Sequence, residues 1–372
     1  MKKTFDGFLR SDGNAGTRNH IGIISSVICS SIVTKEIAEK VSGSIPIVHA
    51  NGCAQLGDDF QVTKDMLVGV ASNPNLYAAL LVGLGCETNQ ISGLLKSIPK
   101  TKPVKGIGIQ QMAGGKNTIE AGISIASAWA EEVKKEKRVT LPLSKLKVGI
   151  VTVDIDEETL EKTVPVVSKV IDKLLNQGAY TVIALTDTLE PAGDILAEKA
   201  DDLELKQKLV NLSKGLNRKI WKESIDYEIK DFSKQEKRLA HLEAKLIGDQ
   251  KIISLLNYND LPKEQGLHLI KSSNNIVETL SNMASIGCNI AIVLSSRGVL
   301  SSSIALPSMT IAPQNPYTQF DELIDYKVNE SNIVQQAEKV LNELINHASG
   351  KQTVLEEYEL GEFSIPHVGT TF

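Results

Sequence analysis

Four short apolar runs, rich in β-branched residues, recur through the first third of the chain, and a helical pattern separates each run from the next. The runs are Ile21–Val27, Ile45–Ala50, Ala78–Leu84 and Val104–Ile109. A run that is apolar at nearly every position is typical of a strand covered on both faces, as in a parallel sheet. Because parallel neighbours joined through helices require right-handed crossovers, this order predicts an open, doubly wound sheet.

A second α/β pattern follows a charged stretch, Lys134–Ser144, which we interpret as a linker because a proline interrupts it. Strands are expected at Val148–Val153 and Tyr180–Thr186, with a helix near Glu157–Leu175 between them. Residues 191–251 carry dense charge and predict a solvated helical insertion that packs on one side. Strand signals resume after the insertion, so the second sheet is also expected to be mostly parallel.

The chain has 372 residues, about twice the size of a common domain. We therefore predict an α/β fold of two doubly wound, mostly parallel domains of the Rossmann-like or flavodoxin-like type. The first is expected at residues 1–140, and the second at residues 145–372, with the helical insertion and a C-terminal tail. Because ligands of such sheets bind beyond the carboxyl ends of the strands, the loops at those ends are the first candidates for a site.

Charge and hydropathy exclude two classes of protein. Lys and Arg number 40 against 45 Asp and Glu, a formal charge of −5, which argues against a nucleic-acid or anionic-membrane surface. No apolar stretch reaches the roughly 18 residues of a membrane span, and the start, MKKTFDGFLRSDGNAGTRN, lacks the apolar core of a signal peptide. We therefore expect a cytoplasmic protein with neither a nucleic-acid nor a membrane partner.

The cysteines Cys29, Cys53, Cys86 and Cys288 form no CxxC pair, which argues against a zinc ribbon or a thioredoxin-type site. The first three each follow a predicted strand, and carboxyl ends of parallel strands meet at one edge, so these thiols are expected to converge. A thiol at a helix N-terminus has a lowered pKa, which makes it a better metal ligand or nucleophile. The alternative is that each is a buried structural thiol.

The stretch from His49 to Asp59, HANGCAQLGDD, follows a strand and precedes a helix. It brings an imidazole, a thiol, an amide and two carboxylates together around two glycines. Histidine and cysteine suit Fe²⁺ or Zn²⁺, and paired carboxylates can orient a base or bind a metal ion. The same letters also fit a glycine-rich turn whose Asp58 or Asp59 caps the next helix.

Three other loops carry groups that can hold an anion. Arg18 and Asn19 lie in a glycine-flanked loop, where a guanidinium can fork onto a carboxylate, although a self-satisfied turn is equally compatible. Gln110 opens a loop that ends in two glycines, and Arg297 follows a later strand, where a plain surface loop is the alternative. The Gln110 loop lacks the GxxxxGK[ST] spacing of a phosphate-binding loop, and no Rossmann GxGxxG motif follows the first strand, which disfavours a nicotinamide enzyme.

Several segments, in order, resemble one family, the altronate/galactarate dehydratases and their relative, the large subunit of sulfolactate sulfo-lyase. Gly7–Val27 resembles the family's opening G-Y-x-R-x-D-G-x-x-G-x-R-N, and HANGCAQLGDD resembles H-x-x-G-C-x-Q-x-G-D-D. NPNLYAALLVGLGCETNQ resembles N-P-N-x-x-x-x-L-V-V-G-L-G-C-E-x-N-Q, and Ile119–Gly122 resembles I-E-x-G. Fainter matches follow at Leu242–Gly248 (LEAKLIG), at Ser295–Gly298 and at the closing Glu362-Phe363.

The resemblance implies a metal-dependent hydro-lyase that converts a sugar acid, such as altronate or galactarate, to a 2-keto-3-deoxy acid. It implies Fe²⁺ as the cofactor, with Mn²⁺ as an alternative and an iron–sulfur cluster left open because three cysteines suffice for one. A bound ion would stabilise the enediolate that forms when the proton beside the carboxylate is removed. The resemblance also implies the large subunit of a two-chain enzyme, with a small SAF-like partner of about 100 residues, in a homo-oligomer or hetero-oligomer.

The candidate groups then take three roles. As metal ligands we expect His49, Cys53, Cys86 and Glu87; as acid–base groups His49, Asp58, Asp59 and Lys245, the last singled out only by the family match; and as substrate-binding groups Arg18, Asn19, Gln110 and Arg297.

The second half departs from the family's pattern. Where the family carries C-G-G-S-D, this chain reads Thr152–Asp156 (TVDID), so the cysteine is replaced by Thr152. The family's glycine-rich N-P-x-P-G-N-K-x-G-G is replaced near Ser233–Leu239 by SKQEKRL. Two alternatives to the dehydratase therefore stay open: a carbon–sulfur lyase acting on sulfolactate by the same enolate chemistry, and a catalytically degenerate paralogue that binds a sugar acid and regulates.

Overall fold

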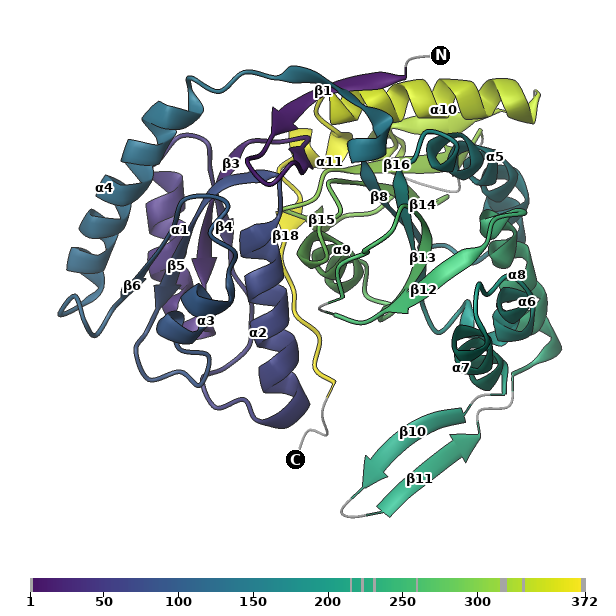
Figure 1. Cartoon of the computed structure of the whole chain (residues 1–372), viewed down its shortest axis with the longest axis horizontal. Coiled ribbons are helices and arrows are strands. Elements are labelled where there is room, and N and C mark those ends of the chain that lie inside the picture. Colours follow the sequence, from purple (N-terminus) through teal and green to yellow (C-terminus); the bar gives the residue numbers. More distant parts are fainter. Residues whose placement is uncertain are drawn as a thin grey trace.

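The computed structural model describes residues 3–214, 216–221, 224–229, 232–258, 260–314, 320–329 and 332–368. The chain is an α/β protein built around two parallel sheets, which lie side by side with helices around each of them (Figure 1). The predicted α/β class is therefore confirmed. Within the described ranges, no helix combines the length and the apolar character that a membrane crossing requires.

The first sheet has four parallel strands in the order β4-β3-β5-β6. The chain adds β4 on one side of β3 and then β5 and β6 on the other, which is the doubly wound order predicted from the apolar runs. Each predicted strand is present with its bounds shifted by a few residues: β3 is His20–Ser25, β4 is Ser44–Ile47, β5 is Leu76–Gly83 and β6 is Val104–Gly108.

Helices cover both faces of this sheet because successive strand residues point to opposite sides. Ile23 and Leu80 pack in one core with α1 and α4, whereas Ile24 and Leu81 pack in another with α2 and α3. The helices are α1 (Ser31–Glu39), α2 (Gly57–Ser72), α3 (Ile91–Ser97) and α4 (Gly115–Val133).

The second sheet has seven parallel strands in the order β12-β13-β9-β8-β14-β16-β17. From β8 the chain adds β9, then β12 at the edge and β13 between β12 and β9, and it then crosses to the other side of β8 with β14, so the strand order reverses between β8 and β14. The strands are β8 (Lys147–Thr152), β9 (Tyr180–Leu185), β12 (Ile252–Leu256), β13 (Gly266–Lys271), β14 (Ile290–Leu294), β16 (Ser308–Pro313) and β17 (Tyr326–Val328).

Two helices, α5 (Glu157–Leu175) and α10 (Ile333–Ala348), cover one face of the second sheet, and α9 (Ile276–Ser285) covers the other. The α9 core is shared with α2 of the first half, and the Ser285 hydroxyl donates to the Met66 carbonyl at 3.0 Å. The two halves are therefore packed through one continuous apolar core.

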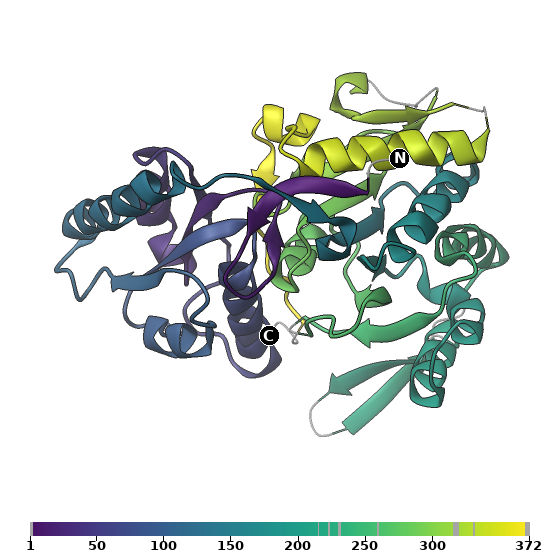
Figure 2. The ribbon, with the colours of Figure 1, turned by 45° about the horizontal axis from the view of Figure 1, so that its top comes forward.

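The stretch predicted to be a linker contains a strand, which corrects the prediction. β7 (Val139–Pro142) pairs with β1 (Thr4–Leu9), which pairs in turn with β2 (Ala15–Gly16), in a small antiparallel sheet. Phe5 and Leu141 are opposite each other and both are buried, so this short pairing has an apolar reason that the surrounding charge conceals. Figure 2 shows β1 beside α10.

The insertion at 191–251 is only partly helical, and the helical prediction is wrong over its middle. The helices α6 (Gly193–Glu198), α7 (Leu203–Ser213) and α8 (Lys234–Ala244) flank an antiparallel hairpin of β10 (Leu216–Trp221) and β11 (Ser224–Ile229). The segments LNRKIW and SIDYEI carry the β-branched and aromatic residues that favour strands, and this local preference overrides the dense charge.

Buried polar contacts join the two halves at the amino ends of their strands. The Thr17 hydroxyl donates to the Asn289 carbonyl at 2.5 Å, and Asn75 Nδ2 donates to the same carbonyl at 3.1 Å. Asn75 precedes β5 and Asn289 precedes β14, so both sheets start from this junction. The loops that follow the strands therefore lie at the opposite ends of the strands from the junction.

The C-terminal tail runs from the second half to the first. After α11 (Val354–Glu357), β18 (Gly361–Glu362) pairs with β15 (Ser302–Ser303). The tail, drawn in yellow in Figure 1, then passes beside α2, and the Val368 N–H donates to Asp59 Oδ1 at 2.7 Å.

Candidate functional site

The loops that follow β3, β4, β5 and β6 meet at the carboxyl edge of the first sheet, as the strand pattern predicts. The loop after β6 is joined to the 84–90 loop because the Gln110 N–H donates to the Leu84 carbonyl at 3.0 Å. The 49–56 and 84–90 loops are joined by Thr88, whose N–H and hydroxyl donate to the Cys53 carbonyl at 3.0 and 3.2 Å. The Ile28 N–H, after β3, donates to the Asn51 carbonyl at 3.0 Å. These bonds place the segments that carry Cys29, Cys53 and Cys86 next to one another.

Glu87 is a buried carboxylate at the centre of this edge, with 2% of its surface exposed. Its Oε1 accepts from the Ser26 hydroxyl at 2.8 Å, and its Oε2 accepts from the Gly85 N–H at 2.6 Å. Gly85 has φ +120°, and a Cβ on Gly83 would lie 2.2 Å from Glu87 Oε1, so glycine is required on both counts. The Gly-Leu-Gly turn therefore leaves room for this carboxylate and supplies the Gly85 N–H that binds it.

His49 is buried beside the same edge, with 5% of its surface exposed. Its Nδ1 lies 3.2 Å from the Asn51 N–H, which donates to it, and Nε2 has no hydrogen-bond partner among the described residues. Burial lowers the His49 pKa to about 4, although the backbone of Ser25 and Ser26 raises it in part. The ring is therefore neutral at pH 7, its single lone pair accepts from Asn51, and its proton is on Nε2.

This geometry does not fit the metal site that the sequence predicts. A neutral imidazole binds a metal ion through a lone pair, and the His49 lone pair is occupied by the Asn51 N–H. Cys53 and Cys86 are both exposed at the edge, as is Cys29. Within the part of the chain that the structure describes, no three His, Cys, Asp or Glu side chains converge to hold a metal ion.

Cys288 differs from the other thiols because it is buried in the shared core. Burial raises its pKa to about 12, although Lys147 nearby lowers it in part. Cys288 is therefore an inert structural thiol, whereas the three exposed thiols lie at the loop edge.

Asp58 and Asp59 lie in the first turn of α2, where carboxylates interact favourably with the helix dipole. Neither is the N-cap, since that position is Leu56. Asp58 is exposed, and Asp59 binds the tail through Val368, with His367 Nδ1 at 3.8 Å. The structure thus gives Asp59 a role in holding the tail.

Gln110 is exposed beside the 84–90 loop: a Cβ on Gly85 would lie 2.7 Å from its Oε1. The turn after it contains Ala113 at φ +58° and Gly114 at φ +126°, and α4 begins at the next residue. A non-glycine residue in the left-handed region is uncommon and is often found at functional turns. The backbone N–H groups of the first turn of α4 are presented at this edge, where they suit an anion.

Arg18 and Asn19 are not part of this edge, which corrects their predicted role in substrate binding. They precede β3, whose six residues span about 20 Å. All five N–H groups of Arg18 are used inside the protein: two bind the Glu356 carboxylate and three bind the carbonyls of Thr17, His347 and Lys351. No N–H donor is left for a substrate carboxylate.

Arg297 and Lys245 belong to the second sheet. Arg297 follows β14 and is exposed, and its backbone N–H donates to Asp154 Oδ2 at 3.0 Å. Lys245 is exposed at the end of α8. Neither residue lies among the loops that carry His49 and Glu87.

A carboxylate that the sequence interpretation missed lies two positions before Lys245. Glu243 is 1% exposed, and the Thr188 hydroxyl donates to its Oε2 at 3.4 Å. Ala240, Glu243 and Ala244 are the buried residues of α8, at the i, i+3, i+4 spacing of a helix face. This spacing is the sequence signal that indicates a buried position, but the dense charge around it conceals it.

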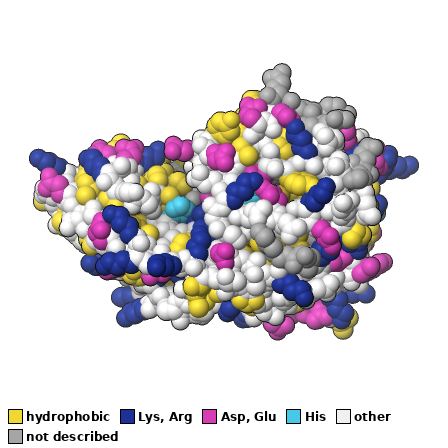
Figure 3. All heavy atoms as spheres, turned by 90° about the horizontal axis from the view of Figure 1, so that it is seen from above, with side chains coloured by type: hydrophobic (Ala, Val, Ile, Leu, Met, Phe, Trp, Pro, Cys, Tyr) yellow, Lys and Arg dark blue, Asp and Glu magenta, His cyan; other side chains and the backbone are white. Residues whose placement is uncertain are grey.

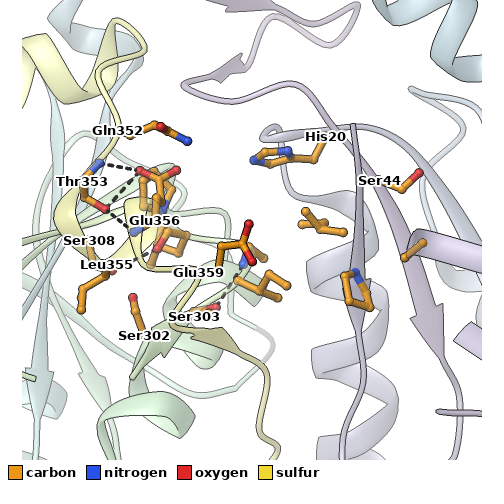
Figure 4. Close-up of a pocket in the computed structure, with 18 of the residues that line it drawn as sticks. His20, Ser44, Ser302, Ser303, Ser308, Gln352, Thr353, Leu355, Glu356 and Glu359 are labelled. Carbon is orange, nitrogen blue, oxygen red and sulfur yellow. Dashed lines mark hydrogen bonds between the residues drawn. The ribbon is translucent and has the colours of Figure 1, made fainter. Parts of the chain in front are cut away.

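A cavity of about 530 Å³ lies between the halves on the side where the strands begin (Figure 4). His20 from β3 faces Thr353 and Glu356 of the α11 segment across it, and Ser302 of β15 lies below. Figure 3, viewed onto that side, shows a hollow between the halves and an even mixture of basic and acidic side chains. None of the predicted site residues lines the cavity. We place the candidate site at the carboxyl edge because ligands of doubly wound sheets bind there.

Comparison with known proteins gives two family matches that cover almost the whole chain. Residues 7–134 match the family described as D-galactarate dehydratase/Altronate hydrolase, second domain. Residues 143–371 match the family described as D-galactarate/Altronate dehydratase, C-terminal.

Curated relatives agree with these matches. Altronate dehydratase of Bacillus subtilis (strain 168) is 28% identical over 396 residues, which cover 99% of this chain and 78% of the relative. Altronate dehydratase of Escherichia coli (strain K12) is 26% identical, with 98% and 78% covered. The (2R)-sulfolactate sulfo-lyase subunit beta of Chromohalobacter salexigens is 24% identical, with 97% and 96% covered.

Proposed function

Because the chain belongs to the D-galactarate dehydratase/altronate hydrolase family, we propose that it is a hydro-lyase that dehydrates a sugar acid such as altronate or galactarate to a 2-keto-3-deoxy acid. The observation that carries the proposal is the pair of family matches, in order, over residues 7–134 and 143–371. The relatives named as dehydratases support the same class of reaction, a carbon–oxygen lyase.

The reaction removes the proton beside the substrate carboxylate and expels the neighbouring hydroxyl as water, and the resulting enol tautomerises to the keto acid. The carbon–hydrogen and carbon–oxygen bonds break, and the departing hydroxyl takes up one proton, so acid and base steps balance. Transition-state charge collects on the carboxylate oxygens. A site for this reaction therefore needs hydrogen-bond donors for those oxygens and a group that exchanges protons.

The carboxyl edge of the first sheet supplies the donors. The first turn of α4 and Gln110 suit the substrate carboxylate. The Glu87 carboxylate, seated by Ser26 and Gly85, can accept from a substrate hydroxyl through its remaining lone pairs. These roles bind and orient a hydroxy acid without a metal ion.

Fe²⁺ dependence, with Mn²⁺ as an alternative, stays a prediction from the family resemblance, as does the choice between a single ion and a cluster. The residues as placed do not fit a metal site, so no step of the proposed mechanism depends on one.

The relative named as a subunit supports a role as the large subunit of a two-chain enzyme. We propose a small SAF-like partner of about 100 residues, the scale of a typical small domain, in a homo-oligomeric or hetero-oligomeric assembly. The same relative favours sulfolactate as a second candidate substrate, because the match covers 96% of it.

The test is turnover by the purified chain under anaerobic conditions with Fe²⁺. The chain is assayed alone and together with the part of the Bacillus subtilis altronate dehydratase that it does not cover. Altronate, galactarate and (2R)-sulfolactate are offered, and 2-keto acid and sulfite are measured. Keto acid from either sugar acid supports the proposal, and sulfite from sulfolactate alone moves the activity to carbon–sulfur lysis. No product from any of the three would contradict an enzymatic role and favour a non-catalytic paralogue.

A further inference from the structure

The second sheet has a small cleft of its own at the carboxyl ends of β8, β9 and β13. Its volume is about 50 Å³, and hydroxyl and amide groups line much of it: Thr152, Thr186, Thr188, Ser273 and Asn274. A water molecule needs roughly 10–15 Å³ of such volume, so the cleft admits a few waters or the end of a small polar ligand.

The hydroxyls of the cleft face one another and a buried carboxyl group. Thr152 is 6% exposed, and its hydroxyl is close enough to Glu243 to lower the pKa of that carboxyl group. Thr186 and Thr188 share a hydrogen bond of 2.7 Å between their hydroxyls.

Glu243 lies behind the cleft. The Thr188 hydroxyl, which lines the cleft, donates to Glu243 Oε2 at 3.4 Å. Burial raises the Glu243 pKa to about 7, although the hydroxyls of Thr152 and Thr188 lower it in part. A carboxyl group that is half protonated near neutral pH can both give and take a proton.

The elements that pack against α8 bring few other charges toward this carboxyl group. Glu190, from the short helix before α6, is buried, whereas Asp194 of α6 and Glu157 of α5 are exposed beside His241 and Arg238. A buried position with alanine neighbours on the same helix face would suit leucine, so a carboxylate there is costly for packing alone.

We propose that this cleft is a proton-exchange site for a hydroxy acid, in which Glu243 exchanges a proton with the bound ligand through the Thr188 hydroxyl. The inference rests on the proposed function for its substrate class, and it assigns proton transfer to this cleft and not to the first-sheet edge, whose groups were proposed only to bind and orient. When the departing hydroxyl of the ligand takes the Thr188 proton and leaves as water, Thr188 Oγ1 takes a proton from protonated Glu243, and the proton that the substrate loses beside its carboxylate restores Glu243. No oxidant or other reactant is consumed.

The test uses the whole chain together with the uncovered part of the Bacillus subtilis altronate dehydratase, altronate and galactarate as the probes, and Glu243→Gln as the main variant. Glutamine has the size of glutamic acid and still accepts from Thr188, but it exchanges no proton at this position. Because general acid–base groups contribute about 10²–10⁴-fold, turnover should fall by at least about 100-fold and the pH–rate limb near 7 should disappear. KM should change by no more than about threefold if Glu243 acts only in proton transfer.

A second pair of variants guards against a folding defect. Thr188→Ser keeps the hydroxyl and should keep turnover, whereas Thr188→Val keeps the shape and should lose it. Lys237→Gln, on the exposed face of α8, is the matched control and should behave like the wild type. Calorimetric binding of altronate in two buffers of different ionisation enthalpy adds a readout that needs no turnover, namely the protons exchanged on binding.

Each outcome decides the matter. Turnover that is lost in Glu243→Gln and Thr188→Val supports the site. Turnover that is unchanged in both overturns it while the proposed function stands. Binding without turnover, with a proton exchange that Glu243→Gln abolishes, supports the site and overturns the proposed function. Binding without such an exchange, or no binding at all, overturns both.

Discussion

The Arg18 guanidinium binds the Glu356 carboxylate through two parallel hydrogen bonds, each 2.6 Å long, although the two residues are 338 positions apart in the sequence. Nε and Nη2 each bind one carboxylate oxygen, which is the fork geometry that arginine alone provides. The remaining N–H groups bind three carbonyls. The pair therefore fastens the loop before β3 to α11 and is a structural joint between the two halves.

Replacing Arg18 should destabilise the fold without acting on the substrate directly. Arg18→Met leaves Glu356 without its cation in a mostly buried place, and removing one partner of such a pair costs about 3–5 kcal/mol. Arg18→Lys should recover only part of this, because an ammonium cannot bind both oxygens. Urea unfolding of the three proteins checks the order. A raised KM with unchanged unfolding free energy in Arg18→Met would show instead that Arg18 binds the substrate.

The same pair predicts a loss of stability in acid. Burial raises the Glu356 pKa, but the hydrogen bonds and charge of Arg18, together with Thr353, outweigh it and lower the pKa below 4.5. A carboxyl group with a lowered folded pKa contributes stability above its unfolded pKa, and loses it as pH falls through the folded value. Glu356→Gln should therefore flatten the unfolding free energy against pH below about pH 4.5. A curve parallel to that of the wild type would contradict this.

His49 should be neutral, with its proton on Nε2, across the whole neutral range. The folded pKa of about 4 lies below the unfolded value of 6.5, so the unfolded chain binds a proton first as pH falls. His49 therefore stabilises the fold fully above pH 6.5, and about 3 kcal/mol is lost between pH 6.5 and 4. Nitrogen-detected NMR of the ring should report the Nε2–H form at pH 7.

His49→Gln provides the matched thermodynamic test. The variant should lose part of the pH dependence of unfolding between pH 6.5 and 4. An Nδ1–H tautomer in the wild type would remove the argument against His49 as a metal ligand, because Nε2 would then carry a free lone pair.

The strand order was predictable because its signal is local. Neighbours such as Ile23 and Ile24 are both apolar although they point to opposite faces of a covered strand. The helical stretches between the apolar runs indicate the crossovers. The hairpin at 216–229 and the strand β7 were missed because short antiparallel pairs at a surface carry charge and leave weak patterns. The same local signal predicts that Cys53 and Glu87 share one edge of the sheet, since each follows a strand of that sheet.

Partnerships between distant residues could not be predicted. An arginine in a glycine-flanked loop suggests an anion, but the anion proved to be Glu356, near the other end of the chain. His49 was expected to offer a lone pair, and only the structure shows that the Asn51 N–H occupies it. Glu243 was missed for a related reason: burial of a charged residue depends on what packs above it, and Thr188 comes from another element.

Iron binding is a separate prediction that the thiols can test. If Fe²⁺ binds as the family resemblance implies, the loops of this edge must rearrange to bring the exposed thiols together; wild-type protein purified anaerobically with Fe²⁺ then retains iron, and Cys53→Ser and Cys86→Ser each lower it. Cys288→Ala is the control, since that thiol is buried and its pKa is raised to about 12. Acid-labile sulfide separates an iron–sulfur cluster from a single ion. Equal iron in wild type and both serine variants would rule out this ligand assignment.

Asp59 should hold the C-terminal tail against the start of α2. Its Oδ1 accepts from the Val368 N–H at 2.7 Å, and removing a charged acceptor of this kind costs about 1.5–3 kcal/mol. Asp59→Ala should therefore speed amide hydrogen exchange over residues 363–368 by about tenfold or more, as measured by mass spectrometry. Asp58→Ala is the matched control, because it removes the same favourable charge from the first turn of the helix, whereas the Val368 N–H bonds to Asp59. Equal exchange in the two variants would mean that the helix end, and not the hydrogen bond to Val368, holds the tail in place.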